Sequence, residues 1–147
     1  MITLIEEPEP WTYVGAAAVV DTSVLVDFAL ETASRHDSAV AVIRRLVERQ
    51  VRIRVPYHAA FEFLATVRRC VKFEGARHAK HADRGDTSLV ASIHAVPINS
   101  AFVDHYGTGD LPHLRAGDLI FLALARGGGV AIITEDEELH KRPARSE

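Results

Sequence analysis

The sequence contains very little cysteine and no long apolar run. The single cysteine, Cys70, excludes an internal disulfide bond and fits a reducing cytoplasm. No stretch approaches the roughly 20 apolar residues that a membrane-spanning helix requires. Glu6, Glu7 and Glu9 stand where a secretory signal would carry positive charge, so we expect no signal peptide. Repeats and low-complexity segments are also lacking, and the sequence therefore predicts a cytoplasmic globular protein that does not associate with a membrane.

What is present fits one α/β domain. The 147 residues are enough for a single domain with a sizeable core. Short apolar segments alternate with helical patterns, which is typical of βαβ units and a mostly parallel sheet. We expect residues 1–14, which are acidic and contain two prolines, to form an N-terminal extension, and residues 15–147 to form the domain.

Hydrophobic periodicity predicts the elements of this domain. The expected strands cover residues 15–20, 51–55, 95–98 and 130–134, and the expected helices cover residues 24–30, 34–50, 57–72, 100–106 and 119–125. Residues 51–55 alternate apolar and charged side chains, which predicts a partly exposed strand. Pro97 favours an edge position for residues 95–98. Residues 83–88 read as a turn or as the start of a short helix running to Ile93, and Gly127 to Gly129 read as a glycine hinge before the buried last strand.

Three aspartates border these elements. Asp21 follows the first strand, Asp118 opens the apolar helix, and Asp136 follows the last strand. The carboxyl ends of parallel strands meet at one edge of a sheet, where open α/β folds bind ligands, so we expect the acids to collect there. Each aspartate taken alone is also explained by helix capping, because a carboxylate accepts hydrogen bonds from the free N–H groups of a helix start.

Glu62 adds a fourth acid within a helical segment that is otherwise nearly uncharged. Its neighbours Phe61 and Leu64 are apolar, and a buried carboxylate requires a compensating cation. Arg68 or Arg69 supplies that cation in a structural interpretation, and a divalent metal shared with the aspartates supplies it in a functional one. Oxygen ligands without a Cys/His set favour Mg²⁺ or Mn²⁺ over zinc.

The charges are unevenly distributed. Residues 44–84 hold eleven basic residues against four acidic ones, whereas residues 104–136 hold five acidic residues against two arginines. Cationic walls around an anionic pocket would suit a polyphosphate bound through metal ions. The alternative is that the basic residues lie on solvated helix faces.

The segment AVVDTSVLV (residues 18–26) resembles the opening motif of PIN-domain ribonucleases, especially the VapC-type toxins of type II toxin–antitoxin pairs. Glu62 in its helix, Asp118 in AGDLI and Asp136 in TEDEEL match the remaining acidic positions in the same order. The resemblance covers residues 16–140. Two features depart from the pattern: the acidic extension of residues 1–14, and Gly117 immediately before Asp118.

The resemblance implies a three-layer α/β/α fold and a Mg²⁺- or Mn²⁺-dependent endoribonuclease that cleaves single-stranded or looped RNA and inhibits translation. Asp21, Asp118 and Asp136 would hold one or two ions, and Glu62 would complete the set through water or help to deprotonate the nucleophile. The implied partners are the RNA, a cognate antitoxin, and a second copy of the chain in a homodimer.

Hydroxyl groups near these acids are candidates to orient them. Thr22, Ser23 and Thr134 are able to donate hydrogen bonds to the carboxylates, although an N-cap or turn role explains them as well. His58 has no nucleophile beside it and reads as an ordinary polar residue. His78 and His81 are three residues apart, which is too weak a pattern to predict a zinc site.

Two other classes of protein remain in view. A non-catalytic PIN-like module would bind RNA or a protein but would not need four converging carboxylates. A receiver-like phospho-accepting domain also gathers aspartates on a parallel sheet, but it requires a lysine after a late strand, where this chain reads Ile133-Thr-Glu-Asp.

Overall fold

The computed structural model describes residues 2–79, 91–107 and 112–134. Its strands are β1 (Ile2–Glu6), β2 (Ala17–Val20), β3 (Arg52–Pro56), β4 (Ala91–Val96) and β5 (Ala131–Ile133). Its helices are the 3-10 turn η1 (Pro10–Thr12) and the α-helices α1 (Thr22–Ala29), α2 (His36–Glu48), α3 (Tyr57–Phe73), α4 (Ser100–Tyr106) and α5 (Ala116–Gly128). Residues 83–88 and the acid Asp136 lie outside the described residues. A helix running on to Ile93 is wrong, because Ala91 to Ile93 belong to β4.

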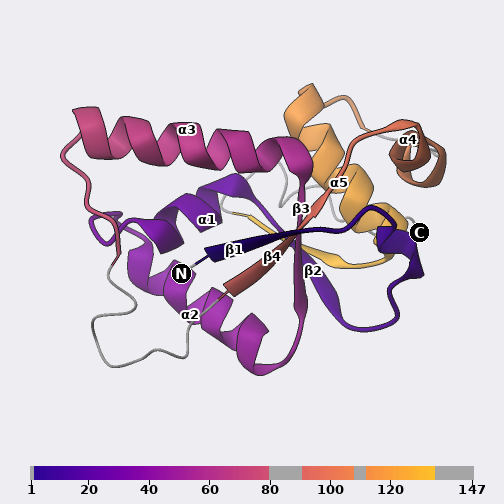
Figure 1. Cartoon of the computed structure of the whole chain (residues 1–147), viewed down its shortest axis with the longest axis horizontal. Coiled ribbons are helices and arrows are strands. Elements are labelled where there is room, and N and C mark those ends of the chain that lie inside the picture. Colours follow the sequence, from indigo (N-terminus) through magenta and orange to yellow (C-terminus); the bar gives the residue numbers. More distant parts are fainter. Residues whose placement is uncertain (1, 80–90, 108–111, 135–147) are drawn as a thin grey trace.

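The strands form one parallel sheet in the order β1-β4-β3-β2-β5. The chain steps from β2 through β3 to β4 in one direction and then returns to β5 on the other side of β2. Because parallel crossovers are right-handed, this reversal places α1, α2 and α3 on one face of the sheet and α4 and α5 on the other (Figure 1). The predicted three-layer α/β/α fold with a parallel sheet is therefore confirmed.

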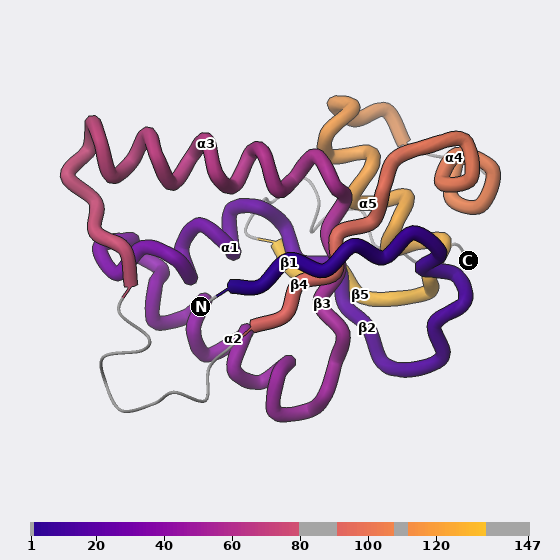
Figure 2. Tube along the Cα trace, viewed as in Figure 1, coloured from indigo at the N-terminus to yellow at the C-terminus, as the bar shows by residue number. Residues whose placement is uncertain are grey.

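The predicted N-terminal extension contributes a strand to this sheet. β1 pairs with β4 from Ile2 opposite Ala91 to Glu6 opposite Ala95, and Figure 2 shows the two segments side by side. The η1 turn then places the Trp11 ring on the His105 ring of α4, with centroids 3.8 Å apart. The described part of the extension is thus packed along the sheet and against α4.

The edge position predicted for the strand around Pro97 is wrong. β4 lies between β1 and β3, and it ends at Val96, one residue before the proline. Since Pro97 falls beyond the paired residues, its missing N–H removes no hydrogen bond from the sheet. One edge is occupied by β1, which was not predicted as a strand. The other edge is occupied by β5, and the prediction that this strand is buried is wrong for Ala131, which is exposed.

The partial exposure predicted for β3 is also wrong for Arg54, whose exposed fraction is only 3%. Its Nε and Nη2 donate to the two carboxylate oxygens of Glu7, at 3.0 and 2.9 Å, and Nη2 also donates to the Pro10 carbonyl at 2.8 Å. Arg52 donates to the same carboxylate at 2.6 Å and lies over the Tyr13 ring. The buried charge is tolerated because a two-pronged ion pair with the N-terminal segment satisfies it.

The apolar helix predicted before the last strand is the buried half of α5. Phe121 to Ala125 are all buried, and all of them except Leu122 belong to the core cluster that includes the sheet residues. The predicted glycine hinge is wrong for Gly127 and Gly128, because the helix continues through both. The Tyr106 ring packs so closely that a Cβ on Gly127 would overlap it. Gly129 then ends the helix in the left-handed conformation, with φ of 62°, a backbone conformation that glycine adopts without strain.

No α-helix in residues 2–79, 91–107 and 112–134 is long and apolar enough to cross a membrane.

Candidate active site

Asp21 lies at the carboxyl end of β2, where the direction of the strand order reverses. Its Oδ1 accepts a hydrogen bond from the backbone N–H of Thr22 at 2.7 Å, so the residue caps α1. Its Oδ2 accepts hydrogen bonds from the hydroxyls of Thr134 at 2.7 Å and Ser23 at 3.3 Å. One carboxylate therefore caps a helix and is also held by a hydroxyl from the end of β5.

The pairing of β2 with β5 explains why Thr134 reaches Asp21. Val20 lies opposite Ile133, and the Asp21 N–H donates to the Ile133 carbonyl at 2.8 Å. The next residue along each strand then faces the other across the carboxyl edge of the sheet. Thr134 is only 5% exposed, so its hydroxyl is held in a closely packed position.

Glu62 reaches the same edge from the second turn of α3. Its Oε2 accepts a hydrogen bond from the Thr22 hydroxyl at 3.1 Å, and its Oε1 lies 3.7 Å from His58 Nε2. The side chain is 48% exposed, so it is not the buried carboxylate that the sequence allowed. Arg69, one of the cations considered for it, pairs with Glu74 instead, at 3.7 Å.

Asp118 lies in the first turn of α5 and is partly buried. The residue before it, Gly117, lies against α3: a Cβ there would be 3.8 Å from Glu62 Oε1 and 3.9 Å from His58 Nε2. The first turn of α5 thus borders the Glu62 carboxylate, which Thr22 links to Asp21. The fourth predicted acid, Asp136, lies outside the described residues, two positions after Thr134.

The donor chemistry of this edge suits a hard divalent cation. Carboxylate and hydroxyl oxygens are the ligands that Mg²⁺ and Mn²⁺ prefer. In the part of the chain that the structure describes, however, no group of three or more His, Cys, Asp or Glu side chains is arranged to hold a metal ion. The described residues therefore supply the right ligand type but do not by themselves complete a metal site.

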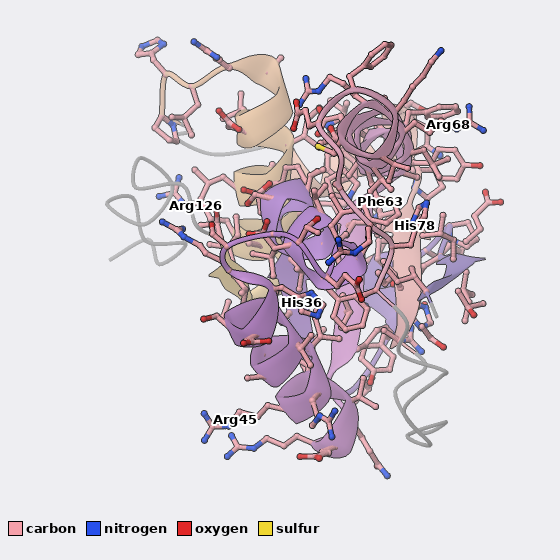
Figure 3. The ribbon with its side chains drawn as sticks, turned by 90° about the vertical axis from the view of Figure 1, so that its left-hand side faces the viewer. His36, Arg45, Phe63, Arg68, His78 and Arg126 are labelled. Carbon is pink, nitrogen blue, oxygen red and sulfur yellow. The ribbon has the colours of Figure 1, made fainter. Side chains whose placement is uncertain are left out.

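The basic residues of the middle segment are spread over the surface. Figure 3 shows Arg45 on α2 and Arg68 on α3 at opposite ends of the molecule. The described basic residues of this segment that are exposed are Arg44, Arg45, Arg49, Arg68, Arg69, Lys72 and Arg77. All but Arg49 and Arg77, which follow α2 and α3, lie on solvated helix faces, which agrees with the alternative interpretation of the basic segment.

Sequence reasoning missed His58. The residue lies beside Glu62 on the same face of α3, and it also contacts Phe121 of α5 in an edge-on ring arrangement with centroids 5.9 Å apart. The signal that would have found it is its spacing, because residues four apart on a helix lie one above the other. Neither a nucleophile nor a zinc ligand stands near His58 in the sequence, so it reads there as an ordinary polar residue.

The fold and the site together define an α/β protein with acidic residues at the carboxyl edge of a parallel sheet, next to the point where the strand order reverses. A comparison with protein families identifies it further: the model of the PIN domain matches residues 18–145. The chain belongs to the PIN domain family, whose members are generally nucleases that typically use divalent metals. The match begins after β1 and η1. No curated protein matched the chain.

Proposed function

We propose that this PIN domain is a Mg²⁺- or Mn²⁺-dependent endoribonuclease that hydrolyses phosphodiester bonds in single-stranded or looped RNA. The observation that carries the proposal is the hydrogen-bonded array at the carboxyl edge, in which Thr22 joins Asp21 to Glu62. We assign the metal-holding role to Asp21, Glu62, Asp118 and Asp136. Of these, Asp136 is assigned on its place in the sequence alone.

The residues around the acids would fix their orientation. The Thr134 and Ser23 hydroxyls point their hydrogens at Asp21 Oδ2, and the Thr22 hydroxyl does the same for Glu62 Oε2. Such contacts hold a carboxylate with its remaining lone pairs directed outward, which strengthens binding to a cation. A divalent ion bound there would stabilise charge on the phosphate and lower the pKa of the attacking water. In this proposal Glu62, which is half-exposed, would accept a proton from that water.

The finer biological role rests on the resemblance of AVVDTSVLV and the later acids to VapC-type toxins. On that basis we propose that the chain is the toxin of a toxin–antitoxin pair, which acts in the cytoplasm and inhibits translation by cleaving RNA. We further propose that it forms a homodimer and is neutralised by a cognate antitoxin. The competing proposal is a PIN-like module that binds RNA or a protein without cleaving.

Cleavage of a labelled RNA separates the nuclease from the binding module. With a pool of single-stranded and hairpin RNAs, we expect cleavage in Mg²⁺ or Mn²⁺ and none in EDTA. Asp21→Asn and Asp118→Asn each remove one carboxylate charge and should lower kcat/KM by about 100-fold or more. Asp104→Asn is the matched control, since Asp104 is exposed on α4, and it should leave the rate unchanged.

Two results would contradict this assignment. Cleavage that survives EDTA, or that persists in both aspartate variants, would show that these acids do not carry the reaction. RNA binding without cleavage under any metal condition would instead favour the non-catalytic module.

A further inference from the structure

Among the residues that the structure describes, one oxygen of the Glu62 carboxylate has a hydrogen-bond donor and the other has none. Oε2 accepts from the Thr22 hydroxyl at 3.1 Å, whereas Oε1 has His58 Nε2 as its neighbour at 3.7 Å, slightly beyond hydrogen-bonding distance. His58 and Glu62 are one turn apart on α3, so rotations about the Glu62 side-chain bonds bring the two atoms together without moving the backbone.

The His58 ring is packed in a way that requires explanation. Both ring nitrogens are shielded from solvent, and among the described residues neither has a hydrogen-bond partner. The ring sits edge-on to Phe121 of α5, and its side chain is only 30% exposed. Because an unsatisfied buried nitrogen is unfavourable, an apolar residue would fill this position at lower cost if packing were its only role.

The start of α5 lies close to this pair. A Cβ on Gly117 would be in ordinary van der Waals contact with Glu62 Oε1, at 3.8 Å, and with His58 Nε2, at 3.9 Å. The first turn of α5, which carries Asp118, therefore lies against α3 at the level of His58 and Glu62.

We propose that His58 is a positioning residue for Glu62. In the tautomer with hydrogen on Nε2, the imidazole donates to Oε1 while the Thr22 hydroxyl donates to Oε2, so that the carboxylate is held from both sides. The remaining lone pairs of Glu62 then face the space between α1, α3 and the start of α5. This inference rests on the proposed function, and it adds a residue that acts through Glu62 and not on the RNA.

The test measures Mn²⁺ affinity by calorimetry and RNA cleavage by kinetics in the same proteins. His58→Leu keeps the packing on Phe121 but removes the donor. We expect it to weaken Mn²⁺ binding about 10-fold and to lower kcat by about 10- to 100-fold, with the KM for RNA changed less than about twofold. Its thermal stability should stay equal or rise, because an unsatisfied polar group is removed.

Two further substitutions separate positioning from packing. His58→Gln places an amide donor near the position of Nε2 and should restore most of the Mn²⁺ affinity, whereas His58→Asn places its donor near Nδ1 and should not. In a Glu62→Gln background, adding His58→Leu should cause no further loss of Mn²⁺ affinity, because the residue it positions has already been changed.

The outcomes are distinguishable. If the wild-type protein binds Mn²⁺ and cleaves RNA but His58→Leu does both equally well, the positioning role is wrong and the nuclease proposal stands. The same conclusion follows if His58→Leu weakens binding as much in the Glu62→Gln background as in the wild type, or if Gln and Asn rescue equally. A wild-type protein that neither binds Mn²⁺ nor cleaves RNA overturns both proposals.

Discussion

Thr22 contacts both described acids whose hydrogen bonds define the site. Its backbone N–H donates to Asp21 and its hydroxyl donates to Glu62, although the two acids are 41 positions apart in the sequence. The same residue starts α1, so forming the helix also brings its two donors into place. At the residue scale, helix capping and orientation of the acids are therefore not competing explanations, because one set of contacts performs both.

His94 should make the stability of the folded protein depend on pH. It lies on β4 opposite Arg54, and its pKa is lowered from 6.5 first by burial and then by the Arg52 and Arg54 charges, with Glu7 opposing them. Folding therefore favours neutral His94. The unfolded chain binds more protons as the pH falls below 6.5, so the stability that His94 contributes is present above that pH and is lost below it.

Urea unfolding between pH 7.5 and 5.5 tests this sign. We expect the wild-type protein to lose more stability on acidification than His94→Gln, whose side chain does not titrate. His113→Gln is the matched control, because His113 is exposed, and it should follow the wild-type curve. If His94→Gln loses as much stability on acidification as the wild type, folding does not favour the neutral form of His94.

Periodicity and spacing predicted part of the site at this scale. Asp21 and Glu62 were identified because each stands out locally, the first at a strand-to-helix junction and the second in an uncharged helix. His58 was missed because its significance depends on two other elements: α5, which buries its ring, and α1, which fixes the far side of Glu62. Neither contact can be inferred from the residues next to His58 in the sequence.

An ion pair between Glu7 and Arg54 joins the N-terminal segment to the sheet. Glu7 follows β1 and is 7% exposed, and it is the carboxylate that neutralises Arg54 of β3. Without Glu7 the Arg54 guanidinium would be buried without a counter-charge. Its hydrogen bond to the Pro10 carbonyl would remain, but a carbonyl does not neutralise the charge. β1 and η1 therefore stabilise the interior of the domain as well as covering the edge of β4.

Glu7→Gln tests this element. Because the substitution leaves a buried arginine without its counter-charge, we expect it to lower the free energy of unfolding by about 3 kcal/mol in urea titrations. Glu9→Gln, on the same segment but exposed, should change it by less than about 0.5 kcal/mol. Equal and small effects of the two substitutions would show that the ion pair does not hold the extension to the sheet.

The elements themselves were largely predictable, and their surroundings were not. Apolar segments located β2, β5 and the buried half of α5, and an apolar stripe located α2, because hydrophobic pattern is a local property of the chain. The exposure of β3 and the edge position of β4 were wrong for one shared reason. Both depend on residues 2–10, which pair with β4 and with Arg54 from more than 40 positions away.

For the whole molecule, the order of the strands determines which residues meet. The return of the chain from β4 to β5 across β2 places Thr134 beside Asp21, 113 positions away. The sequence predicted that acids would collect at the carboxyl edge, since that follows from any parallel sheet. It did not predict which strand would lie next to β2, because crossover direction is a property of the complete topology.

We propose that Asp21, Glu62, Asp118 and Asp136 share one divalent cation, and calorimetric titration with Mn²⁺ is the decisive experiment. We expect the wild-type protein to bind Mn²⁺, and Asp21→Asn, Asp118→Asn and Asp136→Asn each to weaken binding about 10-fold or more, while Asp104→Asn does not. Binding that is absent from the wild type, or that is unchanged in any one of the three variants, would contradict it.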